Sequence, residues 1–253
     1  IINMSEFTNK KNNHEVSKIN NIQFGVLSDD MIKKMSCAEI TESAYYDSNG
    51  DPRINGLFDP RMGVTERGKR CKTCEQDYIT CPGHLGHISL GKPVFNIQFD
   101  DTIMKITKCI CVRCSKLLIN KNHSLVKNII KSTKDNKQRF NKILKLITNK
   151  KIERCGCIDD KSDKLLDNGG CGAVQPTKYI NKLREGFASF EWKSDELKTV
   201  VNLQNDKITQ ELNPEMVLSL FKKISAEDAY IMGFHKDWCL PHWLIFQNFP
   251  VMP

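Results

Sequence analysis

The segment "CKTCEQDYITCPGHLGH" places three cysteines and two histidines in one short loop. Cys71, Cys74, Cys81 and His84 follow the spacing Cys-x2-Cys-x6-Cys-x2-His. Structural zinc sites use four sulfur or nitrogen ligands in a tetrahedron, usually supplied as two close pairs. A redox Cys-x-x-Cys pair is the alternative, but it leaves the second pair unexplained. The spacing therefore predicts a zinc site, and it favours His84 over His87 because the second pair then mirrors the first.

A second set of cysteines is spread over a longer segment. Cys111 and Cys114 form another Cys-x-x-Cys pair, and Cys171 lies in the glycine-rich stretch "GGCG". Either Cys155 or Cys157 completes a set of four. Closing a long loop through a metal costs entropy that grows only logarithmically with loop length. Two full ligand sets leave no open position for water, so both predicted zinc sites are structural rather than catalytic.

The composition narrows the class of protein. The chain has 253 residues, a net charge of +8 and a pI of 8.9, which favours an acidic partner, nucleic acid first. It has 11 cysteines and a polar N-terminus, which argues against a secreted disulfide framework. Cys37 and Cys239 stand alone and are predicted to be buried core thiols. No apolar run approaches the roughly 18 residues of a membrane helix, so no membrane contact is expected.

The predicted ligands need secondary structure to position them, and the sequence indicates a mixed α+β chain. The expected elements are a helix after Ser28, a strand over 87–99, a helical segment over 124–150, a short sheet within 177–210, and helices starting at Asn213 and Ser225. In the helical segment, Phe140, Ile143, Leu144 and Ile147 form one apolar stripe. The opposite face is nearly all Lys, Arg, Asn and Gln.

The chain resembles the N-terminal clamp region of the largest subunit of multisubunit DNA-directed RNA polymerases, of the eukaryotic RNA polymerase II type. The resemblance runs from about residue 23 to the last residue and is carried, in order, by "IQFGVLSDDMI", "INGLFDPRMG", "CKTCEQDYITCPGHLGHISLGKPVFNIQF", "CVRCSKLL", "GGCGAVQP", "LFKKISAEDAYIMGF" and "HWLIFQNFPVMP". The composition, rich in Asn, Lys and Ile, indicates an AT-rich genome, and a large DNA virus is one such source.

The resemblance implies an irregular α+β clamp, stapled by zinc, with several helices and short antiparallel sheets. The implied divisions are a disordered tail over 1–20, a clamp core with the first zinc site over 21–115, a helical clamp head over 116–170, and a second part of the core over 171–253 that leads to the lid. The chain is accordingly expected to be a fragment of a longer protein.

The resemblance also implies the ligands and partners. It matches Cys71, Cys74, Cys81 and His84 to one zinc, and Cys111, Cys114 and Cys171 with one intervening cysteine to another. Cys155 is the better match for that cysteine, and Cys157 remains the alternative. The implied partners are the DNA template, the RNA–DNA hybrid, the second-largest and other polymerase subunits, and the remainder of the largest subunit. A cellular protein of this kind would lie in the nucleus, and a viral one in the host cytoplasm or the virion.

The clamp role implies sequence-independent contacts to phosphates. Arg61, Arg67, Lys69 and Arg70 are the candidates, with ordinary solvated surface charge as an equal alternative for each. No catalytic residue is expected, because the family's "NADFDGD" signature is absent from this chain. Magnesium and nucleotidyl transfer would then belong to the assembled polymerase.

Two other functions compete with the clamp. One is a free-standing zinc module for protein–protein contact, such as a RING-like adaptor, although a RING interleaves its ligand pairs and the first four ligands here are contiguous. The other is a zinc-dependent hydrolase, which the full ligand sets disfavour.

Overall fold

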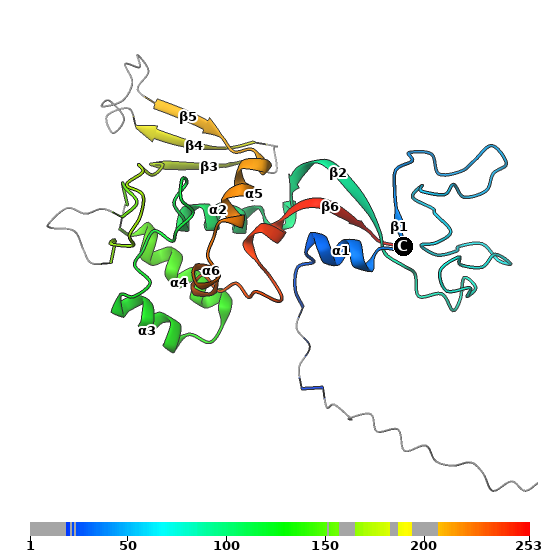
Figure 1. Cartoon of the computed structure of the whole chain (residues 1–253), viewed down its shortest axis with the longest axis horizontal. Coiled ribbons are helices and arrows are strands. Elements are labelled where there is room, and N and C mark those ends of the chain that lie inside the picture. The colour runs from blue at the N-terminus through cyan, green and yellow to red at the C-terminus, as the bar shows by residue number, and fades with distance from the viewer. Residues whose placement is uncertain are drawn as a thin grey trace, which may run out of the picture.

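The computed structural model describes residues 19–20, 22, 24–150, 152–156, 165–182, 187–193 and 207–253. Figure 1 shows two lobes. One is a set of loops over residues 41–85 that contains no helix or named strand. The other is larger and contains most of the helices and a three-stranded sheet. Another three-stranded sheet, the connecting sheet, joins the two lobes.

The connecting sheet has the order β1-β2-β6, from Ala38–Glu39, Gly86–Phe95 and Ile245–Val251. β1 runs parallel to β2, whereas β6 runs antiparallel to it, so this sheet is mixed rather than antiparallel as expected. The expected strand over 87–99 ends at Phe95, because the Asn96 side chain caps a short 3-10 helix. The sheet therefore fixes the base of the loop lobe, since both ends of the loops join it.

Helix α1 (Asp29–Met35) starts after its cap Ser28, as predicted, and packs beside β6. The Oδ1 atom of Asp29 accepts the backbone amides of Gln247 at 3.2 Å and Asn248 at 3.0 Å. A carboxylate in the first turn of a helix is favourable because it faces the positive end of the helix dipole. Asp29 thus joins α1 to a strand that lies more than two hundred residues away in sequence.

The segment predicted to be helical over 124–150 is helical, and one helix outside it was missed. The range 124–150 forms two helices, α3 (Ser124–Ser132) and α4 (Asn136–Thr148). The break occurs because Asp135 caps α4 by accepting the amide of Lys137 at 2.9 Å. Helix α2 (Asp100–Cys109) was not predicted. None of the described helices is long and apolar enough to cross a membrane.

The sheet of the large lobe is antiparallel, in the order β3-β4-β5, from Lys178–Lys182, Phe187–Lys193 and Lys207–Glu211. The strand predicted over "LKTVVNL" lies outside the described residues. Helices α5 (Pro214–Lys222) and α6 (Ala226–Ile231) follow, with the N-caps Asn213 and Ser225 that the sequence predicts. The prediction of an α+β chain is therefore confirmed.

The apolar core is distributed unevenly between the lobes. The large lobe has a continuous core drawn from α2, α4, α5, α6 and β4, and Ile143 of the predicted stripe is fully buried in it. The base of the loop lobe has only a small cluster of Ala38, Ile40 and Met62. So small a cluster buries too little apolar surface to order a long irregular segment, so the loops need another source of stability.

Candidate metal centres

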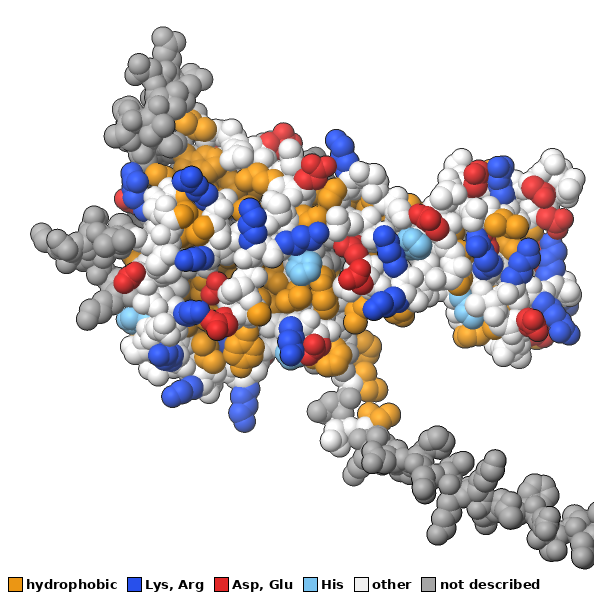
Figure 2. Space-filling view, in the orientation of Figure 1, with side chains coloured by type: hydrophobic (Ala, Val, Ile, Leu, Met, Phe, Trp, Pro, Cys, Tyr) orange, Lys and Arg blue, Asp and Glu red, His pale blue; other side chains and the backbone are white. Residues whose placement is uncertain are grey.

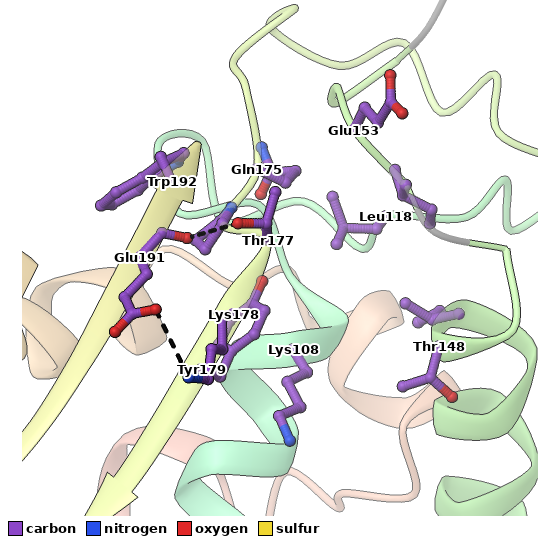
Figure 3. A pocket seen from close by; sticks show the side chains of 13 residues that line it. Lys108, Leu118, Thr148, Glu153, Gln175, Thr177, Lys178, Tyr179, Glu191 and Trp192 are labelled. Atoms are coloured by element: carbon purple, nitrogen blue, oxygen red, sulfur yellow. Dashed lines mark hydrogen bonds and ion pairs between the residues drawn. The ribbon is translucent and has the colours of Figure 1, made fainter. Parts of the chain in front are cut away.

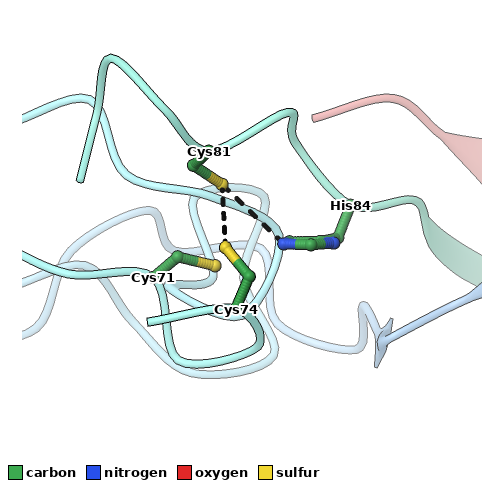
Figure 4. A group of neighbouring side chains, drawn as sticks. All are labelled: Cys71, Cys74, Cys81 and His84. Atoms are coloured by element: carbon green, nitrogen blue, oxygen red, sulfur yellow. Dashed lines mark hydrogen bonds between the residues drawn. The ribbon is translucent and has the colours of Figure 1, made fainter. Parts of the chain in front are cut away.

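The first four predicted ligands converge in the loop lobe (Figure 4). Cys74 Sγ lies 3.6 Å from Cys81 Sγ, which lies 3.7 Å from His84 Nε2. With Cys71 Sγ, these four ligand atoms all lie within 4.8 Å of one another. Sulfur atoms at the corners of a tetrahedron around zinc are about 3.8 Å apart, given Zn–S bonds of ~2.3 Å. The donor set and its spacing therefore fit a tetrahedral zinc ion.

The second set of four also converges, in the large lobe. Cys111 Sγ lies 3.7 Å from Cys171 Sγ, and Cys114 Sγ lies 3.7 Å from Cys155 Sγ. All four sulfur atoms lie within 4.8 Å of one another. Cys157 lies outside the described residues. The structure thus brings Cys155 to the other three sulfurs, and this group also fits a tetrahedral metal ion.

The Cys-x-x-Cys turns present their sulfurs in the same way. The amide of Thr73 donates to Cys71 Sγ at 3.4 Å, and the amide of Arg113 donates to Cys111 Sγ at 3.4 Å. Each turn is closed by a backbone bond, from Cys71 to Gln76 in the first and from Cys111 to Lys116 in the second, both at 2.9 Å. Such amide–sulfur bonds stabilise a thiolate, which is the form of cysteine that binds a metal.

Gln175 adds a side-chain donor to the second centre, and the sequence alone did not single it out. Its Nε2 atom lies 3.3 Å from Cys111 Sγ, and the residue is 2% exposed. The pKa of Cys111 is lowered to about 4, first because the Cys155 thiol beside it hydrogen-bonds to it, and further by backbone amides and Gln175. The lowered pKa favours the thiolate form of Cys111. Gln175 lies four residues after Cys171, in the stretch "CGAVQ". A search of the sequence for amide side chains close to the predicted ligands could therefore have found it.

Glycines make room for Cys155 and Cys171, which are the second pair of ligands in the second centre. A Cβ atom on Gly170 would lie 2.3 Å from Cys155 Sγ, so no other residue fits there without moving the ligand. Gly156 and Gly172 have φ angles of 68° and 73°, in the left-handed region that glycine adopts at little cost. The "GGCG" stretch is therefore required by the geometry of the ligand loop.

The other described cysteines and the alternative ligand His87 lie outside the two groups. His87 lies on β2, where its Nδ1 atom is 2.7 Å from Ser36 Oγ. Cys109 is fully buried, and burial raises the pKa of its thiol. Cys37 packs against the small cluster and donates to the carbonyl of Arg61 at 3.3 Å, and Cys239 packs against the main core. Both are partly exposed rather than fully buried as predicted.

The four predicted phosphate contacts lie around the first centre, but their surroundings differ. Arg61 pairs with the buried carboxylate of Asp59 at 2.5 Å. Lys69 pairs with Asp51 and with Glu66, both at 3.0 Å, and these two carboxylates raise the pKa of Lys69. Arg67 is exposed and lies 6.0 Å from the ring of Tyr78, and Arg70 is exposed. Arg67 and Arg70 are therefore the more accessible cations of the four.

A cavity of about 810 Å³ lies beside the second centre, and Gln175 lines it (Figure 3). Lys108 lies 5.8 Å from the ring of Tyr179, and Lys178 lies 3.7 Å from Glu191 Oε2. Glu191 is therefore already paired with a cation.

Comparison with known proteins finds a matching family and a relative. Residues 16–253 match the family model "RNA polymerase Rpb1, domain 1". The chain is also 37% identical, over 239 residues, to the DNA-directed RNA polymerase II subunit RPB1 of Euplotoides octocarinatus. That match covers 94% of this chain and 47% of the relative, so the chain spans about half the length of the curated relative it matches.

Proposed function

Because the chain belongs to the RNA polymerase Rpb1 domain 1 family, we propose that it is the N-terminal clamp segment of the largest subunit of a DNA-directed RNA polymerase. The single observation that carries this proposal is the convergence of two sets of four Cys and His ligands within the matched range. The clamp holds DNA and the RNA–DNA hybrid, and it works with the second-largest subunit, the other subunits and the remainder of the largest subunit. A cellular protein of this kind would act in the nucleus.

In this proposal the metal at both centres is zinc. The ligands are Cys71, Cys74, Cys81 and His84 in the loop lobe, and Cys111, Cys114, Cys155 and Cys171 in the large lobe. Bound zinc supplies a four-way cross-link between segments. In the loop lobe this cross-link takes the place of the apolar core that the lobe lacks.

The surface of α3 and α4 supports nucleic-acid binding. Lys127, Lys131, Lys137 and Lys145 are exposed on these helices, and Asp135 is the only carboxylate between residues 121 and 150. Figure 2 shows Lys and Arg side chains over these helices, at the lower left of the view. A dense cationic surface binds phosphates regardless of sequence. We propose that this surface, with Arg67 and Arg70, contributes phosphate contacts.

Charge-preserving and charge-removing variants test the phosphate contacts. Replacing Lys127, Lys131 and Lys137 together by Gln should weaken binding to duplex DNA and to RNA–DNA hybrid. It should also lower the slope of log affinity against log salt by up to roughly 0.9 per lost contact. The matched triple replacement by Arg should keep the slope. An unchanged slope in the Gln variant would contradict the assignment of this surface.

The proposed segment is not itself catalytic, and magnesium would bind only in the assembled polymerase. Co-purification tests the function as a whole. A tagged chain in its native cell should recover the second-largest polymerase subunit. Recovery of ubiquitin-conjugating enzymes without polymerase subunits would instead support a free-standing zinc module. The ligand order already favours the clamp, because the two sets do not interleave along the chain as RING ligands do.

A further inference from the structure

Three consecutive backbone carbonyls face the first metal centre. The carbonyl of Pro60 accepts the amide of Lys72 at 3.0 Å, and the carbonyl of Met62 accepts the amide of His84 at 2.8 Å. Between them, the carbonyl of Arg61 accepts the hydroxyl of Thr73 at 2.7 Å. Lys72 and Thr73 lie between the first two ligands, and His84 is the fourth. One turn, residues 59–62, therefore contacts both ligand pairs.

The Asp59 carboxylate fixes the conformation of this turn. Asp59 is 1% exposed, and its Oδ1 atom accepts the backbone amide and the Nε atom of Arg61, both at 2.9 Å. Its Oδ2 atom accepts the amide of Asn55 at 2.6 Å and the Nη2 atom of Arg61 at 2.5 Å. Two parallel bonds from a guanidinium to a carboxylate define both position and orientation.

The charge on Asp59 is compatible with its burial. Burial by itself would raise the pKa of this carboxyl, but hydrogen bonds from Arg61 and Asn55 hold its pKa below the ordinary value. Arg61 also donates to Asn55 Oδ1 at 2.6 Å, so its guanidinium is shared between Asp59 in the turn and Asn55 just before it. The carboxylate of Asp59 and the guanidinium of Arg61 therefore both have hydrogen-bond partners within the protein.

We propose that Asp59 and Arg61 are positioning residues of the first metal centre, which set the turn 59–62 so that its carbonyls hold both ligand pairs at metal-binding distance. This inference rests on the proposed zinc function. It assigns Arg61, a predicted phosphate contact, to the support of the metal site instead. The loop lobe has only a small apolar cluster, so the turn and the metal together order the loops.

Zinc release from the full chain tests the proposal. With a chromophoric chelator in excess, wild type should release two zinc ions, one from each group of ligands. In Asp59→Asn, release from the first centre should be roughly 10- to 100-fold faster, as is typical when a partner of a metal ligand is lost. Release from the second centre should not change, which shows that the large lobe remains folded. Lys69→Met is the matched control, because it removes an exposed ion pair beside the same turn, and its rates should stay within about twofold of wild type.

Cobalt substitution gives a readout of the geometry of the site itself. In Asp59→Asn and in Arg61→Lys, the ligand-field bands of the centre with three sulfurs and one nitrogen should shift, while those of the four-sulfur centre stay fixed. Release rates and spectra that match wild type in both variants would overturn the proposal but leave the zinc function intact. A wild-type chain that binds no metal at the first centre would overturn both.

Discussion

Glu75 and Ser115 share one backbone conformation, with φ of 60° at both, and each directly follows the second cysteine of a Cys-x-x-Cys pair. In each turn, the amide of this residue donates to the carbonyl of the first cysteine, at 2.8 Å for Glu75 and 3.0 Å for Ser115. A left-handed residue at this point turns the chain back so that both sulfurs face the same side. The two centres therefore begin with the same local structure, although their second pairs differ.

The first prediction concerns this left-handed position. Ser115 is 1% exposed, and its hydroxyl has no hydrogen-bond partner among the described residues. Ser115→Gly removes both the strain and the unpaired hydroxyl, so it should raise the free energy of unfolding by about 1 kcal/mol. Ser115→Val should lower it by about 2 kcal/mol, because a β-branched residue resists this conformation. Thermal unfolding of the zinc-loaded chain measures both, and an equal effect of Gly and Val would refute the argument.

The second prediction concerns Gly170. The Cβ atom of Gly170→Ala would lie 2.3 Å from Cys155 Sγ, so the variant should displace this ligand and lose the metal of the second centre only. Gly91→Ala is the matched control, because a Cβ atom there meets nothing within 4 Å. Elemental analysis after dialysis gives the metal content of each variant. Full retention of metal by Gly170→Ala would show that the ligand loop differs from the one described.

The third prediction concerns His242, whose half-buried imidazole has a lowered pKa because of burial and of the nearby charge of Lys222. The unfolded chain then binds more protons than the folded one between the lowered pKa and the ordinary value of 6.5. Stability contributed by neutral His242 should therefore be lost as the pH falls through this window. NMR titration should give a pKa below 6.5, and Lys222→Gln should raise it. A wild-type value above 6.5 would contradict the burial argument.

Local signals predicted the starts of three helices. Ser28 and Ser225 precede helices as expected, and each accepts a backbone amide of the first turn. Asn213 makes no such bond, and the signal for α5 is Pro214 at its first position. Helix α2 was missed because it follows a strand directly through the turn at Asn96, and no strong cap marks its start: Phe99 provides no side-chain bond there. The break between α3 and α4 has no Gly or Pro, and it depends on the cap Asp135.

The metal ligands were easier to predict than the residues that support them. The spacing of Cys71, Cys74, Cys81 and His84 is local, so the sequence alone indicates the group that the structure brings together. The pairing of Asp59 with Arg61 depends on burial, and a sequence gives no direct measure of burial. The sequence therefore offered Arg61 as a candidate phosphate contact, with no sign of its buried partner Asp59.

The metal content of the purified chain tests most directly whether two zinc centres hold this segment together. Native mass spectrometry should find two zinc ions on the wild-type chain, one for each group of four ligands. Cys81→Ser and Cys171→Ser should each retain one, and the double variant none, because each removes a ligand from a different centre. A wild-type chain with one zinc ion or none, or a Cys81→Ser variant that keeps both, would contradict the central claim that two structural zinc centres hold this segment together.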